Sequence, residues 1–437
     1  MSSPSKRKAG LIFVFFTVLI DVLSFGVIIP VLPHLLEQFA GGSVSDAAWW
    51  VGIFGVVFAS IQFACSPLLG ALSDRYGRRP VILLSCFGLG VDFIVMALAD
   101  GLAWLMAGRI VSAVFAASAP VANAYVADVT REQDRAQAYG LLGAAFGVGF
   151  ILGPLIGGVL GDYDLRYPFW LAAALALANF LYGWLVLPES LPPERRAPRV
   201  DWAQANPFAS LRFLREQPQV LALAAVVFLH SLAQFSHQIV FVLYADYQFG
   251  WGQKQAGYVL AAVGAMAAVV SVALVAPMAR RFGERATLLF GLVCGTLGLW
   301  MLAAGDTRWF FWGMPIAALW YLALPAAQAM VSQRIDAQAQ GRAQGALTSL
   351  ISLAGILAPA LYASSFAYVT LPDTRLPLPG APYLVASVLL LAAVAIVWWA
   401  IPAKAATPEP AALAGSAPVD FEPAPTPAPR EAGAEAR

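Results

Sequence analysis

The segment "GALSDRYGRRPVIL" at residues 70–83 places an aspartate and three arginines between two long apolar runs. The whole chain is 437 residues long, 60% hydrophobic and only 12% charged. An ordinary soluble domain has about twice that charged fraction. A water-soluble core could not bury so much apolar surface, so lipid is expected to be part of the solvent. The segment therefore predicts a polar hairpin between two membrane-spanning helices.

Twelve apolar runs are long enough to cross a bilayer, since a spanning helix needs about 20 residues. The predicted spans lie near 10–34, 49–72, 81–99, 102–127, 137–160, 168–188, 220–246, 255–279, 286–304, 308–332, 343–368 and 381–402. The first run is too long for the apolar part of a signal peptide and is interpreted as a retained helix. This pattern predicts an all-α membrane protein with twelve transmembrane helices in two six-helix bundles.

The polar segments divide the chain into four predicted parts. The N-terminal bundle spans 1–188, a proline- and arginine-rich cytoplasmic linker spans 189–219, and the C-terminal bundle spans 220–402. Residues 403–437 are rich in Ala and Pro without apolar periodicity, which predicts a disordered cytoplasmic tail.

Lys and Arg are distributed unevenly between the two sides of the predicted bundle, and this bias sets its orientation. With the N-terminus inside, 21 of the 26 Lys and Arg residues fall in cytoplasmic segments. Only Arg166, Lys254, Arg308 and Arg375 fall in outer loops. Both termini are therefore expected in the cytoplasm, in a bacterial-type inner membrane. The net charge of +1 gives a nucleic-acid partner no electrostatic support.

The two halves of the sequence repeat each other at a shift of about 206 residues. The segment 70–83 aligns with "APMARRFGERATLL" at 276–289, which places Gly77 over Gly283. A second match, 139–158 with 344–363, places Pro154 over Pro359. Parallel six-helix repeats related by an axis along the membrane normal are typical of one transporter architecture, in which the substrate site lies between the halves.

The hairpin pattern resembles the signature motif of the major facilitator superfamily, over essentially residues 9–402. Its matching residues are Gly70, Asp74, Arg75, Gly77, Arg78 and Arg79. The segment "GFILGPLIGG" at 149–158 is similar to the fifth-helix motif of antiporters in that family, with Gly149, Gly153, Pro154, Gly157 and Gly158. Stretches at 19–36, 108–130 and 249–251 resemble the tetracycline-efflux branch of the drug–proton antiporters. The resemblance implies two pseudo-symmetric bundles, a hairpin that closes the cytoplasmic gate against the eleventh span, and a glycine face that seals against proton leak.

The C-terminal half departs from that branch at two positions. Pumps of this type carry a histidine in the eighth span and an aspartate in the ninth. The matching residues here are Ala267 and Gly295. The resemblance therefore does not extend to a second proton-handling carboxylate in the C-terminal half.

Three ionisable residues within the N-terminal spans are predicted to couple transport to protons. Asp21 lies about 12 residues into its span, near the bilayer centre. A charge there costs about 2.5–3.5 kcal/mol on insertion scales and normally faces a cavity or a partner. Removal from water favours the neutral carboxyl group, so Asp21 is expected to bind and release protons; a structural polar contact is the alternative. Asp92 and Arg109 reach similar depths from adjacent spans, which predicts an ion pair, either coupled to transport or static.

A polar stripe on the seventh span suits the wall of a cavity for an amphiphilic organic ligand. The stripe contains His230, Gln234, His237 and Phe241. Hydrogen bonding between helices is the alternative for its polar members. The further cavity candidates are Gln62, Gln238 and Gln328.

The sequence contains no nucleotide-binding loop of the form G-x-x-x-x-G-K-[ST], no catalytic triad and no metal-ligand spacing. Neither an enzyme nor a cofactor is therefore predicted. We predict a monomer, driven by the proton gradient, that exports small lipophilic compounds by alternating access, with tetracycline-like drugs among the candidates. Its expected partners are the lipid bilayer, the substrate and protons. A proton-coupled metabolite symporter and a non-transporting receptor or scaffold are the alternatives.

Overall fold

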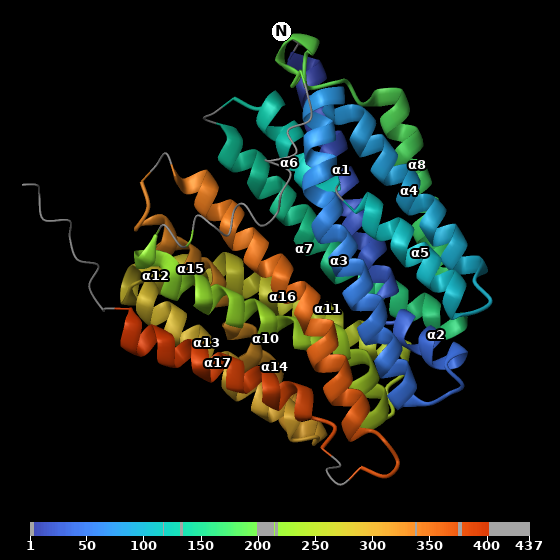
Figure 1. Cartoon of the computed structure of the whole chain (residues 1–437), viewed down its shortest axis with the longest axis vertical. Helices are drawn as coiled ribbons and strands as arrows, with labels where there is room; N and C mark the ends of the chain where they lie inside the picture. Colours follow the sequence, from blue (N-terminus) through green and yellow to red (C-terminus); the bar gives the residue numbers. More distant parts are fainter. Residues whose placement is uncertain are drawn as a thin grey trace, which may run out of the picture. The chain divides into compact units, whose positions relative to one another are not determined.

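The computed structural model describes residues 4–116, 118–131, 134–198, 214, 217–336, 339–374 and 378–401. Residues 1–401 form one compact unit (Figure 1). The predicted tail at 403–437 lies outside the described residues. So do residues 199–213 and 215–216 of the predicted linker. The division of the chain into two bundles and a linker stays a prediction.

The described part of the chain is helical throughout. The first half contains α1 (Pro4–Ile28), α2 (Leu32–Phe39), α3 (Val44–Tyr76), α4 (Arg78–Leu98), α5 (Leu102–Phe115), α6 (Ser118–Val129), α7 (Arg135–Tyr163) and α8 (Tyr167–Val186). The second half contains α10 (Pro218–Phe249), α11 (Gln253–Val269), α12 (Val275–Phe282), α13 (Glu284–Ala303), α14 (Thr307–Ala318), α15 (Ala323–Ser332), α16 (Gln340–Val369) and α17 (Ala381–Ala400). Short helical turns also occur at Pro193–Arg195, Val270–Leu274 and Leu319–Leu322.

Eleven helical segments among the described residues are long and apolar enough to cross a membrane. A twelfth span results if α1 and α2, which meet at a 40° bend, count as one. The bend lies at residues 29–31 and contains Pro30, which has no backbone N–H to donate to the helix. The predicted all-helical, multi-pass membrane fold is thus confirmed.

The span predicted at 308–332 contains a 3-10 turn at Leu319–Leu322, and two further predicted spans are also interrupted in their middle. The span predicted at 102–127 is divided between α5 and α6, because the helix breaks after Phe115. The span predicted at 255–279 contains a π-helical turn at Val270–Leu274 between α11 and α12. Such turns are rare and are frequent at functional sites. Hydropathy does not reveal either break, because the apolar composition continues through both.

The sequence repeat is reproduced in the backbone. Gly77 and Gly283 both end a helix at positive φ, 105° and 80° respectively. L-residues with a side chain rarely adopt this conformation, which explains why both hairpins have glycine there. Each repeat also carries a proline inside its fifth long helix, Pro154 in α7 and Pro359 in α16.

The two halves meet mainly through two helix pairs, α7 with α11 and α3 with α16, and α10 also contacts α2 and α3 (Figure 1). We call the end of the helices that carries the 70–83 hairpin the hairpin end, and the opposite end the far end. Close contacts between the halves lie toward the far end. Ser45 Oγ donates to the carbonyl oxygen of Ala367 at 2.9 Å, and Lys254 Nζ lies 4.0 Å from Asp162 Oδ2.

Candidate functional site

A cavity of about 610 Å³ lies between the two halves. Helices α1, α3, α10 and α16 supply most of its walls. The lining is mainly apolar and aromatic, with a small set of polar side chains. The aromatic residues are Phe25, Phe54, Phe58, Phe63 and Phe235, and the polar ones are Gln62, Ser66, Arg109, Gln238, Thr348, Ser349 and Ser352. An apolar pocket with few polar groups is typical of a binding site for a small organic molecule.

A second cavity of about 330 Å³ lies within the first half and holds two of the predicted coupling residues. Asp21 from α1 and Arg109 from α5 both line it. Arg109, Gln62 and Phe58 line both cavities, so the two cavities share a wall. Asp21 of α1 thus lines the smaller cavity, and the side chain of Arg109 forms part of the wall between this cavity and the larger one.

Asp92 lies beside this wall but is fully buried, with an exposed fraction of 0%. A Cβ added at Gly108 would lie 2.7 Å from Asp92 Oδ1, so the carboxylate packs directly on α5 next to Arg109. Its carboxylate oxygens have no hydrogen bond of good geometry among the described residues, although Ser112 and Arg109 lie close enough to interact with them. The Arg109 guanidinium instead lies over the ring of Phe58, 4.5 Å from its centroid. Asp92 and Arg109 thus make no direct N–O contact in this conformation, although they lie close enough to interact electrostatically.

Gln62 occupies the predicted cavity position and is held by the break between α5 and α6. Its Nε2 donates to the carbonyl oxygen of Ala116 at 3.3 Å. Ala116 follows the last residue of α5, so its carbonyl is available to a side chain. Gln238, on α10, also lines the larger cavity.

The other four predicted cavity residues are not among those that line these two cavities, so their place in a substrate site stays a prediction. They are His230, Gln234, His237 and Gln328. His230 is buried inside the second half, where its Nδ1 accepts a hydrogen bond of 2.8 Å from Trp320 Nε1. His237 stacks on Phe241, 4.9 Å between ring centroids. The stripe packs inward because aromatic partners from the same half cover it, and the neighbouring face of α10, with Phe235 and Gln238, meets the cavity.

The predicted glycine face of α7 makes close helix contacts on two sides. A Cβ at Gly149 would lie 3.0 Å from Val22 Cβ, and one at Gly153 would lie 2.7 Å from Gly26 Cα, both on α1. Gly157 likewise faces the Val27 backbone of α1. A Cβ at Gly158 would lie 2.9 Å from Gly257 Cα of α11, in the other half. The small residues thus let α7 approach both halves of the molecule.

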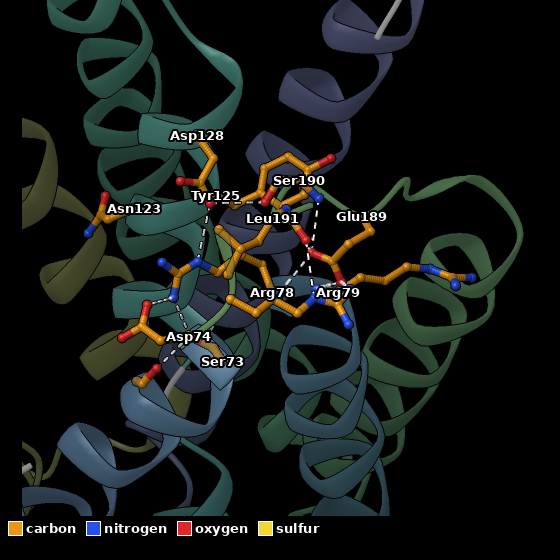
Figure 2. Close-up of polar contacts among 12 residues, drawn as sticks. Ser73, Asp74, Arg78, Arg79, Asn123, Tyr125, Asp128, Glu189, Ser190 and Leu191 are labelled. Carbon is orange, nitrogen blue, oxygen red and sulfur yellow. Dashed lines mark hydrogen bonds and ion pairs between the residues drawn. The ribbon is translucent and has the colours of Figure 1, made fainter. Parts of the chain in front are cut away.

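Figure 2 shows the hairpin residues and their partners. Arg78 is only 11% exposed and contacts three side chains. Its Nη1 donates to Asp74 Oδ1 and to Ser73 Oγ, each at 2.6 Å, and its Nε donates to Asp128 Oδ2 at 3.2 Å. Asp128 belongs to α6, so Arg78 joins the hairpin to a third helix of the same half.

Glu189 is a hairpin partner that sequence reasoning missed. It follows α8, and its carboxylate accepts from the backbone amides of Arg78 and Arg79 at 2.9 and 3.3 Å. A carboxylate at the first turn of α4 also complements the positive end of the helix dipole. Arg79 donates to the carbonyl oxygen of Trp184 at 2.7 Å, which adds a second contact to α8. Glu189 and Asp128 stand far from the hairpin in sequence, and no local pattern connects them to it.

The second half has little space for the acidic residue that the resemblance would place in its third long helix. A Cβ at Gly295 would already lie 2.7 Å from Trp320 Cγ and 3.0 Å from Leu390 Cδ1. No Asp or Glu occurs in the sequence between Asp246 and Glu284 or between Glu284 and Asp306. Within the helices near the cavities, the acidic side chains are Asp21, which is half-buried, and Asp92, which is buried.

Comparisons with known proteins agree with this architecture. The sequence profile described as Major Facilitator Superfamily matches residues 14–359 and 223–431. The class C tetracycline resistance protein of Escherichia coli is 38% identical over 365 residues, covering 82% of this chain and 91% of that protein. The human Hippocampus abundant transcript 1 protein is 33% identical over 336 residues, covering 75% of this chain and 68% of that protein.

Solved structures share the fold. The crystal structure of the human organic anion transporter MFSD10 matches with a TM-score of 0.67 and 25% identity, covering 91% of this chain and 100% of that one. The structure of the nucleoside transporter NupG matches with a TM-score of 0.74 at 12% identity, covering 90% and 100%. The resemblance drawn from the hairpin and from α7 is thus confirmed: this multi-pass membrane protein belongs to the Major Facilitator Superfamily.

Proposed function

We propose that this protein is a proton-coupled exporter of small lipophilic compounds that works by alternating access. The observation that carries the proposal is the shared wall between the two cavities. Asp21 lines the smaller cavity, Arg109 lines both, and the larger cavity lies between the halves, where a substrate would bind. A proton bound or released at Asp21 changes the field that Arg109 experiences, and Arg109 faces the substrate space.

The conformation supports the alternating-access part of the proposal. The close contacts between the halves lie toward the far end, and the Asp74 carboxylate pairs with Arg78 of its own hairpin. We propose that this arrangement is open toward the hairpin end. We propose that this end faces the cytoplasm, as the Lys and Arg bias predicts, and that the hairpin and α16 approach each other when the far end opens.

The proposed substrate class follows from the cavity lining and from the relatives. Phenylalanines form an apolar wall, while Gln62, Gln238 and the hydroxyl groups of α16 provide hydrogen-bonding groups. Such a site suits a planar organic molecule with several polar substituents. Several relatives are named tetracycline resistance proteins, so tetracycline is the first compound to test. We propose that the protein acts as a monomer in the inner membrane, without a bound cofactor.

Transport by vesicles containing the purified protein tests this function under an imposed pH gradient. Export predicts that labelled tetracycline moves opposite to the proton flow. Movement in the same direction as protons would identify a symporter instead. A drug-sensitive strain that expresses the chain identifies further compounds to test. If neither tetracycline nor any of these compounds moves across the vesicle membrane, the result would favour a receptor or scaffold.

A further inference from the structure

Three ligand-bearing side chains from the two halves come together at the far end. His34 and Glu37 lie one turn apart on α2, and Asp246 lies near the end of α10. One ligand atom from each lies within 4.8 Å of the other two, and His34 Nδ1 is 3.8 Å from Glu37 Oε2. Because α2 belongs to the first half and α10 to the second, the group depends on contact between the two halves at the far end.

The group is sheltered and its charges are unbalanced. His34 is 9% exposed and Glu37 is 20% exposed, and His34 Nε2 has no hydrogen-bond partner among the described residues. Two carboxylates held this close repel each other when both are ionised. Closing the far end therefore brings together two negative charges and one imidazole, and a cation between them would offset the repulsion.

The residue types fit a borderline-soft divalent cation. Imidazole nitrogen and carboxylate oxygen are common zinc ligands, at about 2.0–2.2 Å from the metal. Tetrahedral ligands at that distance lie about 3.4 Å apart, so side-chain adjustments of about 1–1.5 Å would close the present group around an ion. Three protein ligands leave the fourth position to water. Mg²⁺ and Ca²⁺ prefer oxygen ligands, which makes a histidine site unfavourable for them.

We propose that His34, Glu37 and Asp246 form a zinc-type divalent cation site that joins the two halves at the far end. The cation binds the state with the far end closed and has no complete site in the opposite state. A ligand that binds only one of two states shifts the population toward it. Zinc outside the cell would therefore hold the protein open toward the hairpin end and slow its transport cycle. The proposal goes beyond the proposed function and does not depend on which compound is carried.

The test uses the full-length protein in nanodiscs, without substrate, and titrates it with Zn²⁺. One equivalent is expected to bind, to raise the melting temperature and to slow amide hydrogen exchange around residues 36–47 and 246–252. His34→Gln and Asp246→Asn should each weaken binding at least tenfold and abolish the exchange effect. Should one of these variants fail to fold, Glu37→Gln carries the same expectation.

Asp162→Asn is the matched control, because the Asp162–Lys254 pair also joins the halves at the far end but contains no histidine. This variant should keep the response to Zn²⁺. The chain has only three histidines, and His230 and His237 lie in the second half, so His237→Gln should also keep it. Absence of binding, or binding that is unchanged in the His34→Gln/Asp246→Asn double variant, overturns the proposal. Equal effects of Mg²⁺ and Zn²⁺ would overturn the zinc-type assignment.

Discussion

Asp21 is the acidic residue that reaches a cavity, whereas Asp92 is sealed against α5. The difference matters for the proposed proton coupling, in which a proton has to reach the coupling carboxylate from one side of the membrane and leave to the other. Of the two residues, Asp21 is the one that lines a described cavity. Asp92 can act only if the packing around Gly108 changes, since that glycine lies against its carboxylate.

Replacing Asp21 by Asn is expected to leave the protein folded and to abolish proton-driven export. Asn has nearly the same shape but does not ionise, so it cannot bind and release a proton. Exchange of labelled for unlabelled substrate across vesicles at equal pH should persist, because this exchange does not need net proton movement. Asp46→Asn, at an exposed position near the start of α3, is the control and should transport normally. Full proton-driven export by Asp21→Asn would remove Asp21 from the mechanism.

At single positions, sequence reasoning was informative where burial in lipid is costly and less so where two buried environments compete. Asp21 could be identified from the sequence because a carboxylate in the middle of a bilayer is energetically costly and normally faces a cavity or a partner. His230 and His237 do not line the two described cavities, since helical spacing shows which residues share a face but not what covers it. Phe54 and Phe58 were missed, although they lie eight and four residues before Gln62 and so share its helix face.

The approach of α7 to α1 depends on individual glycines. A Cβ at Gly153 would meet backbone on α1, 2.7 Å from Gly26 Cα and 2.8 Å from the Leu23 carbonyl oxygen. Backbone cannot turn aside as a side chain can, so Gly153→Ala has to separate the helices. The expected loss is about 1–3 kcal/mol of stability, measured by unfolding in detergent micelles.

Gly147 on the same helix provides the comparison. A Cβ there would meet nothing within 4 Å, so Gly147→Ala is expected to be neutral or to stabilise the helix by up to about 1 kcal/mol. Equal stability of the two variants would show that close packing of α7 on α1 is not what the glycine face provides.

The start of α4 depends on a carboxylate from beyond α8. Glu189 accepts from the amides of Arg78 and Arg79 and also from the amide of Leu191, at 3.1 Å. Glu189→Gln replaces one of two acceptor oxygens with a donor and removes the charge. We expect a loss of about 1–3 kcal/mol and faster hydrogen exchange at the first turn of α4, since hydrogen bonds to charged groups contribute about that much. Glu194→Gln, exposed in the same segment, should change neither quantity.

At the scale of elements, hydropathy predicted the spans because a bilayer sets their length. It could not predict the break after Phe115 or the π-helical turn at Val270–Leu274. Both depend on which backbone groups form hydrogen bonds outside the regular helix pattern. The carbonyl oxygen of Ala116, for example, accepts a hydrogen bond from the Gln62 side chain. Sequence reasoning could not predict the role of Glu189 for the same reason. Its carboxylate reaches the amides of Arg78 and Arg79 only because the fold places the end of α8 beside the hairpin.

In the whole molecule, the 206-residue repeat predicted two related halves with a site between them, but not which end of that site is closed. Both states bury similar apolar surface and use the same helices, so composition does not distinguish them. The atomic contacts do distinguish them. Gly52 and Gly55 of α3 pack on Ala363 and Pro359 of α16, in the far part of both helices.

A cross-link between α3 and α16 at this end should stop transport if the two ends open in turn. A Cβ at Gly52 would lie 2.9 Å from Ala363 Cβ, slightly closer than the about 3.5–4.5 Å of a disulfide. A small separation of the helices would therefore place Gly52→Cys and Ala363→Cys within bonding distance. Oxidation of the double variant is expected to abolish export, and reduction should restore it, because the halves must separate here to open the far end.

The single variants Gly52→Cys and Ala363→Cys, treated with the same oxidant, are the controls, because the chain already contains the free cysteines Cys65, Cys86 and Cys294. Each single variant should retain its export after oxidation. The cross-linked protein should still bind substrate, since the cavity remains open toward the hairpin end. Continued export by a fully cross-linked double variant would mean that the far end does not open during transport, and substrate would then have to leave by another route.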